Sequence, residues 1–540
     1  MKKTQTRRVP SLWRESSNRD ERLRLLLTCF AAVFVLGLAA HAYGFLCAGF
    51  SHDMLNALVV TPVETYWKMQ LGRPGIVLYR RVLRGLIAAP WQLGLLSLLW
   101  LSLSCFLLCD LLSVRSRLFP FLAAGFLTVN LSVIAMTATY LYEMDADLFA
   151  MLLGLCAVFL WDRLGWIALL PGVPLLAFCM GTYQSMISVP LTLMMLLCCA
   201  ALLRGESFSA VFRKGLRALL MLLLGALVYL LSVRLMCAWK GINLAMGSYN
   251  DVGQTVSLSL PQRFLRVYQT WADAFWNPAA SHIEPLVLVL NCLLPLLALW
   301  RLLSWLCTGK AGVREKLLLC VLVLLLPLGM NTAQLGFSGR IHDLMKAAFW
   351  LFPVFCLLIV FLVPTQKRPA LPRAVAAVLA VIFLCSHIQT ANIVYTRKNL
   401  EQNAALSLMT RVVYRLEERE DYVPGETPLV FVGVSPQLQE KIPGFEAYYD
   451  ISGCEESNPL EKSLISYNYN TYAAYFRYIL NNPARMADND SWNRLQTDPR
   501  VQKMPVYPEE GCMQLLDGLL VVKMGDPSAK TDRGLQGGQT

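Results

Sequence analysis

Long apolar stretches separated by short polar segments are the main pattern along this chain. A helix needs roughly 20 mostly apolar residues to cross a bilayer, and about eleven stretches reach or approach that length. The sequence therefore predicts an α-helical polytopic membrane protein. The predicted spans are approximately residues 25–47, 92–113, 119–138, 146–161, 166–181, 184–203, 218–238, 284–303, 317–333, 346–363 and 374–393.

Lysine and arginine gather on alternate sides of these spans. The segment 1–24 is basic, whereas the loops at 139–145 and 181–184 carry no Lys or Arg. Cytoplasmic loops of membrane proteins are enriched in these residues, which predicts a cytoplasmic N-terminus. With an odd number of spans, residues after about 394 then lie outside. Ala40-His41-Ala42 also imitates a signal-peptide cleavage site, but the apolar run is long for a signal and further spans follow.

The composition changes to that of a soluble domain in residues 394–525. A helix is predicted over Arg397–Glu420, and strands over Pro428–Val434 and Gly518–Lys523. The tyrosine-rich stretch Ser466–Leu480 predicts a helix or a binding surface. We expect a small extracytoplasmic α/β domain, followed by a disordered polar tail at 526–540.

Composition supports a membrane protein and argues against nucleic-acid binding. The 540 residues are 56% hydrophobic and only 16% charged, with a net charge of +12. The cations form short runs between apolar stretches instead of one basic patch on a polar background, which excludes nucleic acid as the expected partner. Most of the 16 cysteines fall in or beside apolar stretches without C-x-x-C spacing, which is typical of small buried hydrophobes. Cys454 and Cys512 lie in the polar C-terminal region, where an extracytoplasmic disulfide is one alternative.

The first outer loop, residues 48–91, departs from the charge bias. The stretch Gly75–Ala89 is too charged to span and has the pattern of an amphipathic helix lying in the membrane interface. Its arginines could snorkel to lipid phosphates, or one or two could hold the phosphate of a lipid-linked donor. The charged residues of the loop are Asp53, Glu64, Lys68, Arg73, Arg80, Arg81 and Arg84.

Polar residues also collect at the predicted outer ends of later spans. Each could be an ordinary helix end in the wet interface, but a carboxylate at membrane depth is expensive. Together they predict a polar cavity open to the outside. The residues are Tyr142, Glu143, Asp145, Asp147, Tyr183, Gln184, Arg340 and His342.

Several short motifs resemble those of the GT-C superfamily and, more specifically, the bacterial type II glucosyltransferase membrane family. One departure concerns the first loop, where many GT-C enzymes have adjacent acidic residues and this chain has His52 before a single Asp53. The matching pieces are SHDMLN (51–56), LGRPG (71–75), YLYEMDADLFAMLLG (140–154), GTYQSMISV (181–189), FSGRI (337–341) and MPVYPEEGCMQLLDGLLVVKM (504–524).

The resemblance implies an inverting transferase of the bacterial cytoplasmic membrane. It would move one sugar, glucose by the family name, from a polyprenyl-phosphate donor to a cell-surface glycan. Asp53 is the predicted general base, and the predicted donor-phosphate ligands are Arg73, Arg340, Arg80 and Arg81. Glu143 and Asp145 could instead hold a divalent cation. The predicted substrate-binding residues are His52, Glu64, Tyr142, Glu143, Asp145, Asp147, Tyr183 and Gln184.

Three other functions stay open on the sequence. A polymerase or ligase would use a similar cavity and donor but transfer a whole glycan. A transporter or flippase of lipid-linked sugar would show interrupted spans at matching positions in two halves. Pro171 and Pro174 interrupt the fifth span, without a convincing counterpart in another half. A non-catalytic membrane scaffold is the third.

Overall fold

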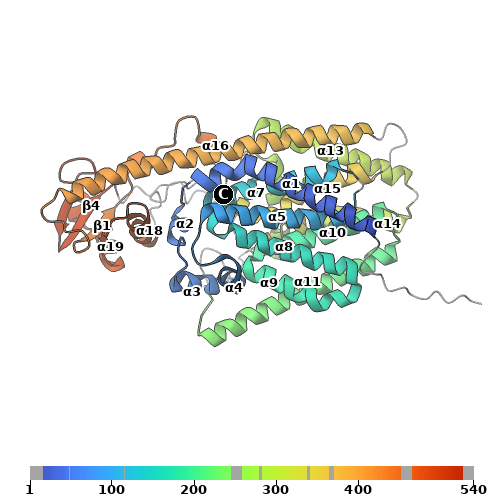
Figure 1. The fold of residues 1–540 in the computed structure, drawn as a ribbon, viewed down its shortest axis with the longest axis horizontal. Coiled ribbons are helices and arrows are strands. Elements are labelled where there is room, and N and C mark those ends of the chain that lie inside the picture. Colours follow the sequence, from blue (N-terminus) through green and yellow to red (C-terminus); the bar gives the residue numbers. More distant parts are fainter. Residues whose placement is uncertain are drawn as a thin grey trace, which may run out of the picture.

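The computed structural model describes residues 16–47, 49–114, 116–244, 258–278, 283–309, 311–336, 341–363, 370–449, 451 and 465–526. Arg340, Cys454 and residues 527–540 lie outside this part, so the predictions made for them are not tested. Figure 1 shows a helical bundle joined by one long helix to a small domain that contains a sheet. We call the end of the bundle nearest that domain the sheet end, and the opposite end the far end.

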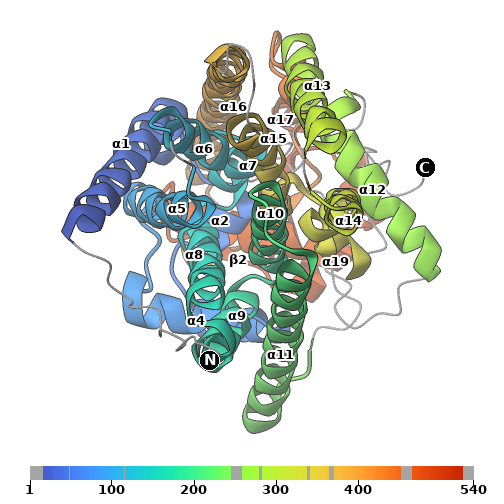
Figure 2. The same cartoon turned by 90° about the vertical axis from the view of Figure 1, so that its right-hand side faces the viewer.

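Every apolar stretch predicted to span is helical in the structure. Viewed along the bundle, α10 lies among α8, α11, α14 and α15 (Figure 2). The helices are α1 (Ser16–Cys47), α5 (Pro90–Leu112), α6 (Leu118–Thr128), α7 (Leu131–Thr139), α8 (Leu141–Leu164), α9 (Leu169–Thr182), α10 (Ser188–Leu203), α11 (Phe208–Lys240), α12 (Leu260–Trp276), α13 (Pro285–Thr308), α14 (Val313–Met330), α15 (Leu351–Leu362) and α16 (Ala370–Glu417). Short helical turns are η2 (Gly165–Ala168), η3 (Gln184–Ile187), η4 (Thr332–Gly336), η5 (Asp343–Met345), η6 (Ala347–Trp350) and η7 (Glu446–Tyr449).

The number of spans differs from the predicted eleven. Within the described residues, seven helical runs are long and apolar enough to cross a membrane, or eight if α6 and α7 together form one span. One of the seven, Leu141–Thr182, contains both α8 and α9. These two helices pack against each other, so the chain turns back between them, near Gly165 at φ 65°. By contrast, α15 is a short helix of 12 residues.

At the break between α6 and α7, one side chain provides hydrogen-bond partners for the backbone groups that have lost theirs. The two helices meet at an angle of 42°. The Asn130 amide accepts a hydrogen bond from the Val133 N–H and donates to the carbonyls of Phe126 and Leu127. Non-helical backbone inside an apolar bundle needs such partners. The break is therefore compatible with a buried position.

The loop between α1 and α5 contains four short helices: α2 (His52–Asn56), α3 (Pro62–Gln70), α4 (Pro74–Tyr79) and the π-helical turn η1 (Arg80–Arg84). The Ser51 and Thr61 hydroxyls cap α2 and α3. The predicted amphipathic helix over 75–89 is found only as far as Arg84, since Gly85 has φ 92° and Ile87 forms a β-bridge with Val59. Leu78, Val82 and Ile87 are exposed, whereas Tyr79, Arg80 and Arg84 are buried.

The C-terminal residues form a sheet with the strand order β2-β1-β4-β3. β1 is parallel to both β2 and β4, and β3 is antiparallel to β4. The two predicted strands and the tyrosine-rich helix are confirmed. The bounds are β1 (Pro428–Val432), β2 (Arg485–Met486), β3 (Met513–Leu516), β4 (Leu519–Lys523), α17 (Pro436–Gln439), α18 (Ile465–Tyr478), α19 (Asn489–Gln496) and α20 (Pro499–Lys503).

The 48-residue helix α16 joins the bundle to this domain without a break. Where it leaves the bundle, three of its charged residues are buried. Arg397 lies over the Tyr449 ring at 4.1 Å, Lys398 donates to the Ala138 carbonyl, and Glu401 accepts from the Tyr449 hydroxyl. These contacts hold α16 to both parts of the molecule.

Candidate functional site

Buried charged residues gather at the sheet end of the bundle, where the loop between α1 and α5 meets the beginning of α8. The acids come from α3 and α8 and the cations from α3, η1 and the residue that precedes α4. We call this group the charge cluster. Its members are Glu64, Lys68, Arg73, Arg80, Arg84, Glu143, Asp145 and Asp147.

Glu143 is the centre of the charge cluster. Its carboxylate pairs with Arg80 at 2.9 Å, with Lys68, and with Arg73 at 3.9 Å. Arg80 also pairs with Glu64 at 2.6 Å, and Lys68 lies 3.7 Å from the same residue. Burying a single charge would cost several kcal/mol. The alternation of acids and cations offsets that cost here.

A second buried pair extends the cluster along α8. The Arg84 guanidinium lies 3.8 Å from the Asp145 carboxylate and donates to the Tyr142 carbonyl. Burial raises the pKa of Tyr79, and the charge of Asp145 raises it further. The Tyr79 phenol therefore stays protonated at neutral pH.

Arg73 is held by residues from three parts of the chain. Its Nε donates to the Gln184 side chain at 3.1 Å, and its guanidinium lies 4.8 Å from the centre of the Tyr183 ring. Burial alone would lower the pKa of Arg73, but the charges of Tyr183 and Glu143 outweigh it and raise that pKa. Its side chain keeps 14% exposure, against 1% for Arg80. The Arg73 guanidinium is thus charged, held in one orientation and still partly exposed at the protein surface.

The motifs LGRPG and GTYQ place Arg73 by packing against each other. A Cβ on Gly75 would lie 2.8 Å from the Gly181 carbonyl carbon, so α4 and α9 meet at a distance that only glycine allows. Gly72 has φ 69°, and its carbonyl accepts a hydrogen bond from the Tyr229 hydroxyl. The same hydroxyl accepts from the Gln184 amide at 3.1 Å.

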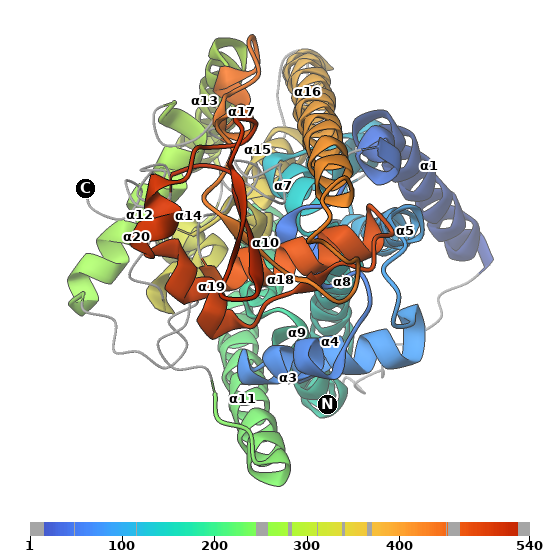
Figure 3. The same ribbon diagram turned by 90° about the vertical axis from the view of Figure 1, so that its left-hand side faces the viewer.

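Asp53 lies on α2, at the rim of the charge cluster. The Ser51 hydroxyl donates to the Thr139 carbonyl and so ties the start of α2 to the end of α7. Asp53 is half-buried and interacts electrostatically with Tyr142, the neighbour of Glu143. On its other side α2 packs against α18, and the Asn56 amide donates to the Thr471 hydroxyl at 3.4 Å. Figure 3 shows α18 in front of the helices of the bundle, at the sheet end.

The structure brings together most of the predicted site residues. Arg81 is the exception, since it is exposed and apart from the buried pairs, and nothing is described for the side chain of His52 or for Arg340. The sequence prediction counted Arg84 only among the interfacial arginines that could hold the donor phosphate, and it gave Lys68 and Tyr229 no role in the site. Lys68 follows Glu64 by four residues, and a helix places side chains at this spacing next to each other. The pairing of Lys68 with Glu64 could therefore have been predicted. Tyr229 lies in an apolar run and gave no signal. The predicted site residues placed at or beside the cluster are Asp53, Glu64, Arg73, Arg80, Tyr142, Glu143, Asp145, Asp147, Tyr183 and Gln184.

The charge cluster does not fit the divalent cation that the sequence left open. The Glu143 and Asp145 carboxylates already face guanidinium and ammonium groups, which would repel a metal ion. Among the described residues, neither belongs to a group of three His, Cys or carboxylate side chains close enough to share one ion. We therefore route no chemistry through a metal at this site.

An apolar helical bundle with a buried cluster of paired charges at one end is typical of a membrane-embedded protein. Residues 42–386 match the model of the family described as glucosyl transferase GtrII, and the chain belongs to that family. The resemblance to the type II glucosyltransferase family is thereby confirmed. No curated protein and no solved structure matches the chain.

Proposed function

We propose that this protein is an inverting GT-C-type glycosyltransferase with Asp53 as its general base. It moves one glucose from a polyprenyl-phosphate donor to a cell-surface glycan, on the outer face of the bacterial cytoplasmic membrane. The family supports glucosyl transfer. The observation that carries the rest is the position of Asp53, a half-buried carboxylate at the rim of a buried cluster that also presents the reachable Arg73.

The reaction needs only one carboxylate. Asp53 takes the proton from the acceptor hydroxyl, whose oxygen forms the new bond to the anomeric carbon. The bond from that carbon to the phosphate oxygen breaks on the opposite face of the sugar, and the electron pair leaves with the phosphate. The leaving group is a stable anion, so no general acid is required. Base catalysis of this kind contributes roughly 10²- to 10⁴-fold.

Arg73 is the residue we assign to the leaving phosphate. A preorganised guanidinium stabilises the negative charge that develops there. Arg80 carries two carboxylate contacts of its own at 2.6 and 2.9 Å, which suits it to hold Glu64 and Glu143 in place. Glu143 in turn orients Arg73. Arg81 and Arg340 remain further candidates for the donor phosphate.

Charged residues at the far end support the proposed orientation. Arg22 and Arg163 both contact Asp110, and Lys214 pairs with Asp162 at 2.6 Å. An excess of Lys and Arg marks cytoplasmic loops. The sheet end, with Asp53 and the C-terminal domain, then faces outward.

The test uses the purified full-length protein, a panel of polyprenyl-phosphate sugars and a glycan acceptor. We expect consumption of the glucose donor and addition of one sugar per acceptor. Asp53→Asn should lower the rate at least about 100-fold with normal expression and insertion. Asp490→Asn, an exposed acid on α19, is the matched control and should keep the wild-type rate.

Four outcomes would contradict the proposal. Retained transfer by Asp53→Asn removes the base. Addition of a preassembled glycan would identify a polymerase or ligase, and movement of the donor across the bilayer without consumption would identify a flippase. Labelling of a single cysteine placed at Asp53 in inside-out vesicles only would reverse the orientation.

A further inference from the structure

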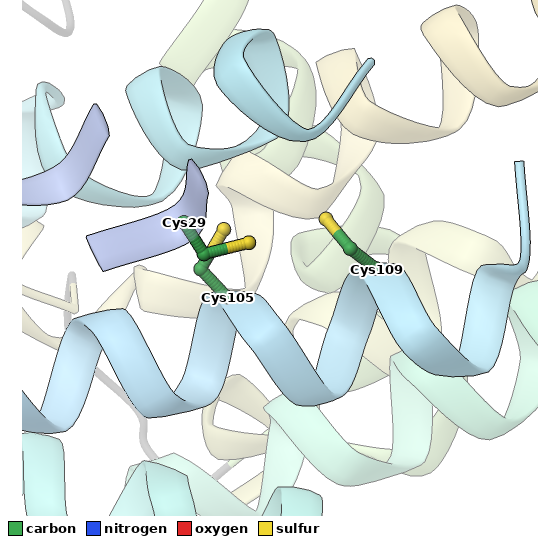
Figure 4. Close-up of side chains that lie close together, drawn as sticks. All are labelled: Cys29, Cys105 and Cys109. Atoms are coloured by element: carbon green, nitrogen blue, oxygen red, sulfur yellow. The ribbon is translucent and has the colours of Figure 1, made fainter. Parts of the chain in front are cut away.

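Three buried cysteines converge at the far end of the bundle, away from the charge cluster. Cys29 lies on α1, and Cys105 and Cys109 lie one turn apart on the facing side of α5 (Figure 4). Their three sulfur atoms all lie within 4.8 Å of one another. Cys29 and Cys105 are fully buried, and Cys109 is 4% exposed.

This grouping differs from ordinary burial of cysteine as a small apolar side chain. Cys198, Cys199 and Cys356 are equally buried, yet within the described chain only Cys29, Cys105 and Cys109 form a group able to share an ion. Helix packing alone needs apolar volume at each position. It does not require sulfur atoms from two helices to point at one another.

We propose that these three thiols form a binding site for a soft monovalent metal ion, Cu(I). Soft thiolate ligands select Cu(I), and structural Zn²⁺ sites use four ligands. No fourth His, Cys, Asp or Glu of the described chain joins the group, so three-coordinate Cu(I) fits better than Zn²⁺.

The geometry needs only a small adjustment. Three sulfurs about 2.3 Å from one ion in a trigonal plane stand about 4 Å apart. Side-chain movements of roughly an ångström or less would bring these sulfurs to that spacing. Cys105 would give up its weak contact with the Pro120 carbonyl, at 4.0 Å. Each thiol that coordinates as thiolate releases its proton to solvent.

Nearby charges favour such an anionic centre. Asp110, the residue after Cys109, lies between two cations: Arg22 donates to it with two nitrogens at 2.9 and 3.0 Å, and Arg163 lies at 3.2 Å. This triad carries one net positive charge, which would be attracted to a copper–thiolate group. Arg22 also lies two helical turns before Cys29 on α1.

A bound ion would act as a clamp between α1 and α5. These two helices flank the loop that carries Asp53 and Arg73, and they pack along each other. A ligand that binds the folded state alone stabilises it by mass action. Cu(I) would therefore stabilise α1 and α5, the two helices between which the loop with Asp53 and Arg73 is held at the sheet end.

The test measures Cu(I) binding to the full-length protein in detergent, with a chromogenic Cu(I) chelator as competitor. We expect one ion per chain and a rise in the unfolding temperature. Cys29→Ala, Cys105→Ala and Cys109→Ala should each weaken binding at least about tenfold, while Cys356→Ala binds as the parent does. All proteins, parent included, would carry alanine at the exposed cysteines Cys47, Cys292, Cys307 and Cys385.

X-ray absorption of the copper-loaded parent protein gives a readout that needs no variant, and three sulfur neighbours are expected. Unchanged affinity in any well-folded variant of the three would overturn the proposal. So would copper with two sulfur ligands only, or the same loss in Cys356→Ala.

Discussion

Glu143 is the residue on which the charge cluster most depends, because three cations face its carboxylate. The sequence marks Glu143 and Arg80 as unusual charges near membrane helices. It does not show that they pair, since they lie 63 residues apart and local patterns contain no signal for such a contact. Tyr229 was missed for the same reason: its partner Gly72 lies 157 residues away.

Replacing Glu143 by Gln should strongly destabilise the protein. The change leaves Lys68 and Arg80 buried beside a neutral amide, and removing one member of a buried ion pair costs about 3–5 kcal/mol. Thermal unfolding in detergent measures the effect. Arg81→Gln, at an exposed position, should leave the unfolding temperature unchanged. Equal stability of both variants would show that the cluster is not held by Glu143.

A variant beside Arg73 tests whether transfer depends on the orientation of the Arg73 guanidinium. Gln184→Leu removes the acceptor of the Arg73 Nε hydrogen bond and the Gln184 donations to the Leu71 carbonyl and the Tyr229 hydroxyl, but it leaves the guanidinium and its charge in place. We expect a lower kcat, because a misplaced group loses transition-state stabilisation, and a drop in unfolding temperature smaller than that of Glu143→Gln, because the lost hydrogen bonds are neutral or involve a partly exposed group. Kinetics with saturating donor measures this. A change in KM alone would assign Gln184 to substrate binding instead.

At the level of elements, apolar pattern predicted where helices occur but not how many cross a membrane. Every predicted stretch contains helix, yet in the part of the chain that the structure describes seven or eight helical runs are long and apolar enough to cross a membrane. One reason is visible in the predicted span 346–363, whose first residues form the turn η6 and leave an α-helix, α15, of only 12 residues. The contact between α4 and α9 was equally invisible, because glycine gives no hydrophobic signal.

Gly75→Ala should separate α4 from α9. The added methyl would lie 2.8 Å from the Gly181 backbone and 2.5 Å from the Thr182 hydroxyl, and overpacking of this kind costs about 1–3 kcal/mol. We expect reduced stability and reduced transfer, because Arg73 moves with α4. Gly215→Ala on α11, where nothing lies within 4 Å, should be neutral or slightly stabilising. Equal behaviour of the two variants would contradict the packing argument.

For the whole molecule, the C-terminal domain is connected to the bundle through α16 and through the contact of α18 with α2. The Tyr448 hydroxyl on η7 also donates to Glu284, the residue before α13, at 3.0 Å. Its core includes Phe431 stacked on Tyr472, with 4.3 Å between ring centres. Composition and β-branched runs sufficed to predict this domain and two of its strands. That α18 would cover the helix carrying Asp53 could not be predicted, because the contact joins residues 415 positions apart.

Phe431→Ala should loosen the domain and leave the bundle intact. Loss of a buried aromatic side chain costs about 3–5 kcal/mol, and α18 would lose its packing partner. We expect faster proteolysis confined to residues after about 417 and lower transfer. Leu515→Ala, at an exposed position on β3, is the control and should resist protease as the wild type does. Undiminished transfer by a proteolysed domain would show that the cover over α2 is dispensable.

The unbroken course of α16 has a mechanical consequence. Its 48 residues extend about 72 Å at 1.5 Å per residue, so the helix works as a rigid strut that sets the height of the sheet above the bundle. A small tilt of α16 where it leaves the bundle would produce a larger displacement of the sheet at the other end of the helix. The sheet and the charge cluster are therefore held at a fixed separation by the length of this one helix.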